Sequence, residues 1–126
     1  MSLFRYRCFN FCEYYYNIES EKPIKCKKCG EYIRPDVVWF GEQLPEEALK
    51  TSYSFIKECD LFFSIGTSSV VQPAASFPFI AKENGAFLVE ININDTPVTG
   101  ISDITIKGKS AEILSFISEE IKKFLT

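Results

Sequence analysis

The chain has 126 residues, of which 46% are hydrophobic and 25% charged, and its formal net charge is −3. This length supports one domain, or one domain with a small extra lobe, and the composition is typical of a globular protein in water. The net charge gives no argument for a nucleic-acid or anionic-membrane partner, because phosphate binding requires a basic face. No apolar run approaches the roughly 20 residues that span a bilayer. The first residues lack a signal-peptide pattern, so we expect a cytoplasmic protein without a membrane partner.

The first part of the chain, residues 4–34, contains four spaced cysteines and little hydrophobic periodicity. Cys26 and Cys29 are separated by two residues, the tight spacing that tetrahedral zinc favours, whereas Cys8 and Cys12 are separated by three. In a reducing compartment, paired cysteines favour a metal over a disulfide. Free or buried thiols are the competing interpretation. We predict a zinc-ribbon lobe in which four thiolates close the shell of one structural zinc: Cys8, Cys12, Cys26 and Cys29.

A strand and a helix are expected next. Residues 37–40 are all apolar, which predicts a short buried strand. Pro45 then opens a helix, with two glutamates at its positive end, Glu46 and Glu47. The inner stripe of this helix is expected at Leu49, Tyr53 and Ile56, and Cys59 is expected to be a core residue.

The remainder of the chain alternates between the two element types. It predicts a buried strand at 61–65, a helix at 74–84 that Gly85 terminates, and a third strand at 86–91. A short strand at 104–106 precedes a last helix with Ser110 as its N-cap. The buried stripe of that helix is expected at Ile113, Ile117, Ile121 and Phe124.

Strands that alternate with helices pair in parallel. We therefore predict an α/β fold: the second half of a doubly wound, Rossmann-like sheet, with about three parallel strands and flanking helices, plus the zinc-ribbon lobe.

Candidate binding residues follow the ends of the predicted strands. The turn at 66–69, Gly-Thr-Ser-Ser, follows the strand at 61–65, and Asn92 follows the next one. Ligands of open α/β sheets bind at this carboxyl edge, where a turn of small residues offers N–H groups and hydroxyls to phosphate or ribose. Each signal is weak alone, but together with Gly41 and Glu42 they predict a binding site. Trp39 and Phe40 fit either a core or a pocket lining.

Several of these segments together resemble the sirtuins, the NAD-dependent protein deacylases. The segments that show the resemblance are Val-Val-Trp-Phe-Gly-Glu at 37–42, Ile-Gly-Thr-Ser at 65–68, Val-Gln-Pro-Ala-Ala at 71–75 and Glu-Ile-Asn at 90–92. Arg34-Pro35 and the four cysteines fit the same pattern, and the resemblance runs from about residue 4 to residue 125. The sequence at 37–42 is most similar to that of bacterial and archaeal members and their desuccinylase-like relatives.

The resemblance implies roles for particular residues. Zinc would be structural and NAD the co-substrate, bound at its phosphate and adenosine end by six residues: Gly66, Thr67, Ser68, Asn92, Lys109 and Ser110. An acyl-lysine protein or peptide would be held as an added strand between two segments, which supply Val38, Phe40, Gly41, Glu42, Val70 and Val71. On this basis residues 4–34 are a zinc-binding lobe and 35–126 a partial NAD-binding, Rossmann-like domain.

The chain also departs from the family. It has no histidine, whereas sirtuins use one as the base on the NAD ribose, and it has neither their Gly-Ala-Gly-x-Ser loop nor their Gln-Asn-x-Asp motif. It begins at the point that follows the histidine in the family, so we expect a C-terminal portion of the enzyme. The parent would transfer an acyl group from lysine to the ADP-ribose of NAD. For the portion itself we expect no catalytic residue and no activity.

Three further expectations stand beside this one. An open edge of the strand at 37–40 predicts self-association into a homo-oligomer. The alternative function is a non-catalytic zinc-ribbon module that binds a nucleotide or a protein. Nucleic-acid binding through the lysines of the cysteine loop is disfavoured, because such charges are usually only solvated.

Overall fold

The structure is a computed structural model that describes residues 2–16, 18, 20 and 22–125. The chain divides into two compact units, Met1–Pro45 and Glu46–Thr126, and each unit contains its own sheet. Among the described residues, no helix is long and apolar enough to cross a membrane.

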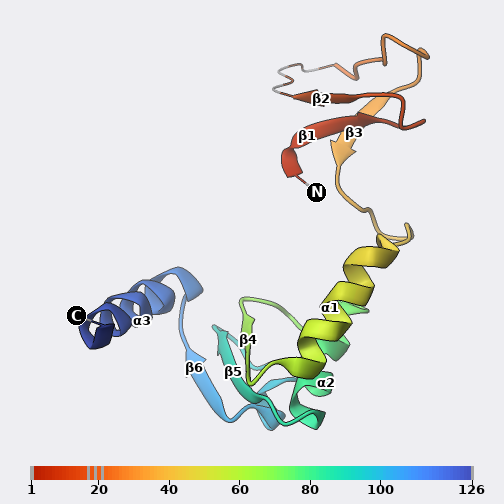
Figure 1. Ribbon diagram of the computed structural model, residues 1–126. Coiled ribbons are helices and arrows are strands. Elements are labelled where there is room, and N and C mark those ends of the chain that lie inside the picture. The colour runs from red at the N-terminus through yellow and green to blue at the C-terminus, as the bar shows by residue number, and fades with distance from the viewer. Residues whose placement is uncertain (1, 17, 19, 21, 126) are drawn as a thin grey trace. The chain divides into compact units, whose positions relative to one another are not determined.

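The first unit is built on a three-stranded antiparallel sheet. Its strands are β1 (Ser2–Cys8), β2 (Tyr14–Tyr16) and β3 (Ile33–Asp36), in the order β2-β1-β3 (red to orange in Figure 1). A tight turn links the first two strands, in which the Cys8 N–H donates to the Glu13 carbonyl over 3.0 Å. A second turn, closed by the bridge between Lys25 and Tyr32, leads into β3. The sheet therefore carries a cysteine pair at each of two turns.

The strand expected at residues 37–40 is absent, and this prediction is wrong. The strand of this region is β3, four residues earlier, and it pairs with β1 instead of entering the parallel sheet. Residues 37–40 are irregular, and the Phe40 side chain is 92% exposed. The physical reason is local. The Val37 carbonyl and the Trp39 N–H, which a strand would offer to a neighbouring strand, are hydrogen-bonded instead to the side chains of Arg34 and Glu42.

The second unit contains a three-stranded parallel sheet with helices. Strands β4 (Leu61–Ile65), β5 (Phe87–Asn92) and β6 (Ile104–Lys107) lie in the order β4-β5-β6. The helices are α1 (Glu46–Glu58), α2 (Phe77–Glu83) and α3 (Ser110–Leu125), with short 3-10 turns η1 (Ala74–Ser76) and η2 (Thr99–Ile101). The predicted α/β fold with about three parallel strands is confirmed by the strands expected at 61–65, 86–91 and 104–106, and residues 37–40 contribute none.

The helix expected at 74–84 is divided into η1 and α2. Pro78 lies in the first turn of α2 and has no N–H to offer to the Ala74 carbonyl, so the α-helical ladder cannot begin at that residue. Phe77 donates to Ala74 instead, which closes the shorter 3-10 turn. Gly85, with φ of 92°, follows the last turn and terminates it as predicted.

The core of the second unit lies between α1, α2 and the sheet. Ile56, Ala81 and Ala86 form a buried cluster, against which partly buried residues pack: Cys59, Phe62, Phe77 and Ile80. Of the inner stripe expected for α1, Ile56 is confirmed as buried, while Leu49 and Tyr53 are half-buried; Cys59 packs against the core as expected. The central strand β5 is buried from Leu88 to Asn92.

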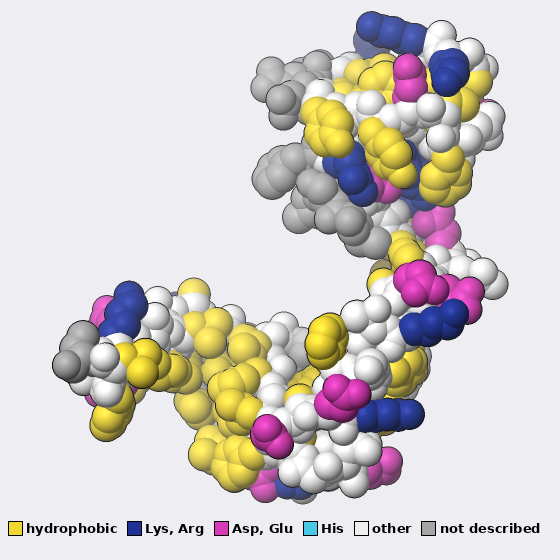
Figure 2. All heavy atoms as spheres, in the orientation of Figure 1, with side chains coloured by type: hydrophobic (Ala, Val, Ile, Leu, Met, Phe, Trp, Pro, Cys, Tyr) yellow, Lys and Arg dark blue, Asp and Glu magenta, His cyan; other side chains and the backbone are white. Residues whose placement is uncertain are grey.

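Two expectations of burial are wrong. In β4 only Ser64 is buried, and Leu61 and Phe63, which lie on one face of this edge strand, are exposed. In α3 no described residue is buried, and Ile121 and Phe124 are 52% and 88% exposed. Apolar side chains consequently show as a yellow area over the sheet and beside α3 in Figure 2. Exposed members of this set are Leu61, Phe63, Phe87, Ile104, Phe116, Ile121 and Phe124.

Candidate functional site

The two turns of the first unit bring the four predicted cysteines together. Their sulfur atoms all lie within 4.8 Å of one another, and the Cys8 Sγ is 3.3 Å from that of Cys29 and 3.9 Å from that of Cys12. Tetrahedral zinc with Zn–S bonds of about 2.3 Å separates its sulfurs by about 3.8 Å. The cluster therefore has the size and the donor set of a four-thiolate zinc site, and it can hold zinc.

The protonation of these thiols also fits a cation at their centre. A hydrogen bond with the Cys29 sulfur, then burial and the Cys8 sulfur, raise the pKa of Cys12 to about 12, and repulsion between neighbouring thiolates adds to this. A hydrogen bond from the Tyr15 hydroxyl, together with backbone N–H groups, lowers the pKa of Cys26 to about 6. Zn²⁺ removes the repulsion between the thiolates and takes four of them at once. With the shell closed, such a metal supports the fold and offers no position to a substrate.

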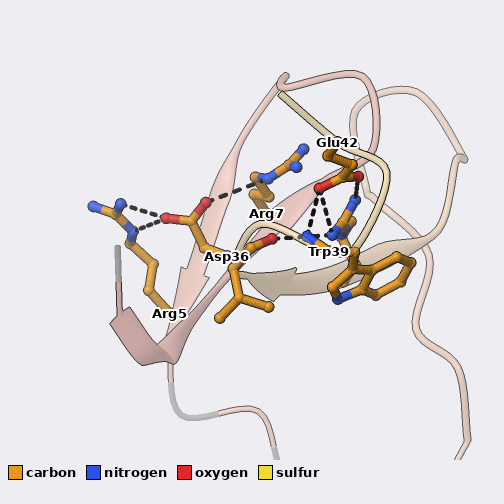
Figure 3. A network of polar contacts seen from close by, with 7 residues as sticks. Arg5, Arg7, Asp36, Trp39 and Glu42 are labelled. Carbon is orange, nitrogen blue, oxygen red and sulfur yellow. Dashed lines mark hydrogen bonds and ion pairs between the residues drawn. The ribbon is translucent and has the colours of Figure 1, made fainter. Parts of the chain in front are cut away.

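Residues 37–42, which we call loop 37–42, are folded around the buried guanidinium of Arg34. This side chain is 3% exposed and pairs with both carboxylate oxygens of Glu42, with 3.1 Å between Nη2 and Oε2. It also donates to the Val37 carbonyl over 3.0 Å. The Glu42 carboxylate accepts the Trp39 N–H as well, over 2.9 Å (Figure 3). These bonds lower the pKa of Glu42 to about 2, so its carboxylate is charged and engaged within the loop.

A second ion cluster lies on the same sheet. Asp36, at the end of β3, accepts from Arg5 over 2.6 Å and pairs with Arg7 over 3.3 Å; both arginines come from β1 (Figure 3). Arg7 on β1 lies opposite Arg34, two residues before Asp36 on β3, and the register of the two strands shifts between Ser2 and Tyr6. The two carboxylates, Asp36 and Glu42, neutralise arginines that the fold brings to one part of the sheet.

The second unit has a pocket of about 680 Å³ at the carboxyl edge of its sheet. We call it the carboxyl-edge pocket. All six residues predicted to bind the nucleotide line it: Gly66, Thr67, Ser68, Asn92, Lys109 and Ser110. They come from three places in the chain, namely the turn after β4, the end of β5 and the start of α3. The rest of the lining includes residues of the segment between β5 and η2, to which no role was assigned from sequence: Ile93, Asn94, Asp95, Thr96 and Pro97.

The backbone at this edge is close-packed. Gly66 has φ of 61°, a conformation that favours glycine, and a Cβ built on it would be in ordinary contact with the Ser110 Oγ at 3.5 Å. The Asn92 Nδ2 donates to the Thr67 carbonyl over 2.7 Å, which ties the turn after β4 to the end of β5. The Asn92 carbonyl in turn accepts the Gly108 N–H over 3.1 Å, which ties β5 to the segment before α3. Asn92 therefore fixes both sides of the pocket.

Sequence reasoning missed the residue beneath the pocket. Glu90 is fully buried on β5, and its two carboxylate oxygens accept the hydroxyls of Thr96 and Thr99, the latter over 2.6 Å. Thr96 belongs to the pocket lining. The sequence feature that could have pointed to Glu90 is a carboxylate within an otherwise apolar predicted strand. A buried charge must have hydrogen-bond partners, so such a residue indicates a polar network.

The six residues predicted to contact the peptide fall in both units. Val38, Phe40, Gly41 and Glu42 belong to loop 37–42 in the first unit, where Phe40 is exposed and Gly41 has φ of 86°. In the second unit Val70 and Val71 are 62% and 50% exposed, and Val70 also lines the carboxyl-edge pocket.

Comparison with known proteins identifies the family. The Sir2 family model matches residues 4–73. A protein named NAD-dependent protein deacylase from Pyrococcus furiosus is 48% identical over 104 residues, which are 82% of this chain and 42% of that protein. The protein of the same name from Thermococcus kodakarensis is 40% identical over 135 residues, with coverage of 98% and 52%. The chain belongs to the Sir2 family, as its motifs suggested.

Solved structures agree with this assignment. A Sir2 homologue in complex with NAD superposes with a TM-score of 0.90 at 38% identity, over 99% of this chain and 50% of the other. A Sir2 homologue with a p53 peptide and NAD⁺ gives a TM-score of 0.84 at 31% identity, over 94% and 52%. The chain thus has the fold of these homologues but spans about half the length of the relatives it matches.

Proposed function

We propose that this chain supplies the structural zinc, the adenosine end of the NAD site and the acyl-lysine segments of an NAD-dependent protein-lysine deacylase. The reaction would transfer the acyl group from lysine to the ADP-ribose of NAD. The observation that carries the proposal is the carboxyl-edge pocket, whose lining contains all six residues that the family resemblance assigns to the nucleotide.

The chemistry of the pocket suits ribose and phosphate. Gly66, Thr67 and Ser68 offer backbone N–H groups and hydroxyls at the end of β4, for the phosphate and the adenosine ribose. The Asn92 Oδ1 accepts the Asn94 N–H over 3.4 Å, and a carbonyl oxygen can accept a second bond, here from an adenine-ribose hydroxyl. Lys109 and Ser110 would lie beside the adenine.

We propose that loop 37–42 contacts the peptide as it would a neighbouring strand, and that Val70 and Val71 also contact the peptide. In this mode, backbone groups give affinity and side-chain contacts give selectivity. Since the Glu42 carboxylate is taken up by Arg34 and Trp39, we propose that Gly41 and Glu42 contact the peptide through their backbone, and that Val38 and Phe40 line the acyl tunnel.

The remaining assignments from the sequence are kept as proposals. We propose a zinc-binding lobe at 4–34, of which residues 17, 19 and 21 lie outside the described part, and a partial NAD-binding domain at 35–126. The cytoplasmic location is also proposed, since four thiolate ligands persist best in a reducing compartment. Self-association is proposed from the exposed apolar side chains of β4, β5 and α3.

Titration of the chain with ADP-ribose tests the proposal. We expect weak binding that is lost in Asn92→Ala and reduced in Ser110→Ala. The matched control is Ser118→Ala, two turns further along α3 and outside the pocket lining, which should bind like the wild type. If ADP-ribose does not bind, or if all four proteins bind it equally, the nucleotide part of the proposal fails and a non-catalytic module becomes the better description.

A further inference from the structure

Loop 37–42 has no regular secondary structure, yet its backbone is bonded to the side chains of two residues. The Arg34 Nη2 donates to the Val37 carbonyl, and the Glu42 Oε2 accepts the Trp39 N–H. The Glu42 N–H also donates to the Trp39 carbonyl over 3.0 Å. Because Arg34 and Glu42 are themselves paired, the loop is closed from its first residue to its last around one salt bridge.

The guanidinium of Arg34 is held on its edge and on its faces. Glu42 occupies the edge as a bidentate partner. On the faces, the Trp39 ring centroid is 3.5 Å from the Arg34 Cζ and that of Phe9 is 5.3 Å away. A guanidinium that is 3% exposed requires such partners, since an unpaired buried charge costs several kcal/mol. Arg34 and the loop therefore depend on each other.

Phe9 extends this cluster to the cysteines. It follows Cys8 directly, its N–H donates to the Tyr32 carbonyl over 3.1 Å, and its ring meets that of Trp39 edge to face with 6.1 Å between centroids. All of these residues belong to the first unit. A cysteine of the cluster is thus one residue from the contact that supports the loop.

We propose that Arg34 is a positioning residue: it holds loop 37–42 in one conformation and joins it, through Phe9, to the sheet that carries the cysteine cluster. The inference rests on the proposed function only for what the loop contacts, an acyl-lysine peptide. A loop that is ordered before the peptide arrives loses less conformational entropy on binding. Arg34 would then contribute to peptide affinity without touching the peptide.

Trp39 provides the probe, because it is the one tryptophan in the sequence. Quenching of its fluorescence by acrylamide measures how far solvent reaches the loop. In zinc-loaded protein we expect Arg34→Met to raise the quenching constant about twofold, as local order is lost. Arg34→Lys keeps the positive charge but loses the planar guanidinium that pairs with both Glu42 oxygens, so its quenching constant should fall between those of the wild type and Arg34→Met. Arg5→Met, which removes an equal charge that pairs with Asp36 on the same sheet, should match the wild type.

Zinc content is measured on every variant. A variant that keeps its zinc but shows higher quenching has a freed loop 37–42, whereas a variant that binds no zinc has an unfolded first unit. Should Arg34→Met bind no zinc, Glu42→Gln tests the same contact from the loop side and should also raise quenching. Unchanged quenching in a zinc-loaded Arg34→Met protein, or in Glu42→Gln where Arg34→Met does not fold, overturns the inference.

A second readout keeps the two proposals apart. If the wild-type chain binds an acetyl-lysine peptide, Arg34→Met should weaken that binding about tenfold while Arg5→Met does not, as expected when pre-organisation is lost. A wild-type chain that binds no such peptide contradicts the proposed function. The quenching of Trp39 still decides the role of Arg34.

Discussion

At the scale of single residues, the buried Glu90 supports the wall of the carboxyl-edge pocket. Glu90 is fully buried on the central strand, and its carboxylate binds two threonine hydroxyls from the segment that forms the pocket wall. Thr96 and Thr99 also bind each other, since the Thr96 N–H donates to the Thr99 Oγ1 over 2.9 Å. The two hydroxyls supply the hydrogen bonds that the buried carboxylate needs, and the same bonds hold the segment of the pocket wall in place.

Replacement of Glu90 by alanine should destabilise the second unit. The change leaves two threonine hydroxyls without their acceptor and opens a cavity under the wall, so we expect the free energy of unfolding to fall by about 2–4 kcal/mol. Urea denaturation followed by circular dichroism measures this. Glu83→Ala, an exposed glutamate at the end of α2, is the control and should change stability by less than about 0.5 kcal/mol. Equal midpoints for the two variants would contradict the role given to Glu90.

At the scale of elements, the sequence predicted the strands and helices of the second unit but none of the three strands of the first. The strand at 61–65 matches β4 to the residue, because apolar runs of this length between turn residues are distinctive. The apolar run at 37–40 has the same appearance and forms no strand, since the outcome depends on Arg34 and Glu42, which lie outside the run. Burial of β4 and α3 was also overestimated, because a hydrophobic stripe shows which face is apolar and not what covers it.

Asp103 ties three elements of the second unit together, and its contribution should depend on pH. Its carboxylate precedes β6, accepts the Leu88 N–H of β5 over 2.7 Å and binds Lys82 of α2 over 2.5 Å. The Leu88 N–H first, and then Lys82, lower the pKa of Asp103 in the folded chain. A lowered pKa stabilises the fold fully above the ordinary aspartate value, about 4, and this contribution disappears as the pH falls through the lower folded value.

Thermal unfolding of Asp103→Asn across pH tests this statement. We expect the variant to melt below the wild type at pH 7 and the difference to shrink as the pH falls below about 4, where the wild-type carboxyl takes up its proton. Asp95→Asn removes an exposed partner of Lys107 and should have little effect at any pH. A difference for Asp103→Asn that grows toward acid pH would contradict the assignment.

The three strands of the first unit should depend on zinc. Its small sheet has two turns that meet at the cysteine cluster, so removal of one ligand should release the metal and unfold the sheet. We expect Cys29→Ser to bind well below one zinc per chain by colorimetric assay. The control is Cys59→Ser, since Cys59 packs against the core of the second unit, and it should retain the metal. A full zinc complement in Cys29→Ser would contradict the four-thiolate site.

At the scale of the whole molecule, the sequence located the candidate residues better than the contacts between them. Cysteine spacing named the four cysteines, the family resemblance named the six pocket residues, and each set is brought together in space. The internal engagement of Glu42 and the buried Glu90 were not predicted, because both depend on contacts with residues of other elements or turns.

The 126-residue polypeptide should not deacylate lysine by itself. We expect this because the chain contains no histidine, the commonest general base near neutral pH. An acetyl-lysine peptide incubated with NAD and the purified chain should release no nicotinamide above the background without protein. Turnover that Asn92→Ala abolishes would contradict this expectation.

The purified chain should also self-associate. Large apolar side chains of β4, β5 and α3 are exposed over neighbouring elements, and contiguous apolar surface of this kind favours association in water (Figure 2). Sedimentation velocity over a range of concentrations should show the mean mass rising with concentration. Phe63→Ser, on the exposed edge strand, should reduce this rise, whereas Phe11→Ser in the first unit should not. A monomer at every concentration would count against the proposal.

The division into two units separates the optical signals of the chain. Trp39 lies in Met1–Pro45, while every helix of the described residues lies in Glu46–Thr126. Tryptophan emission therefore reports on the melting of one unit, and helical ellipticity on that of the other. A single heating experiment recorded with both signals yields two transition curves, and their coincidence or separation measures whether the units unfold as one cooperative system.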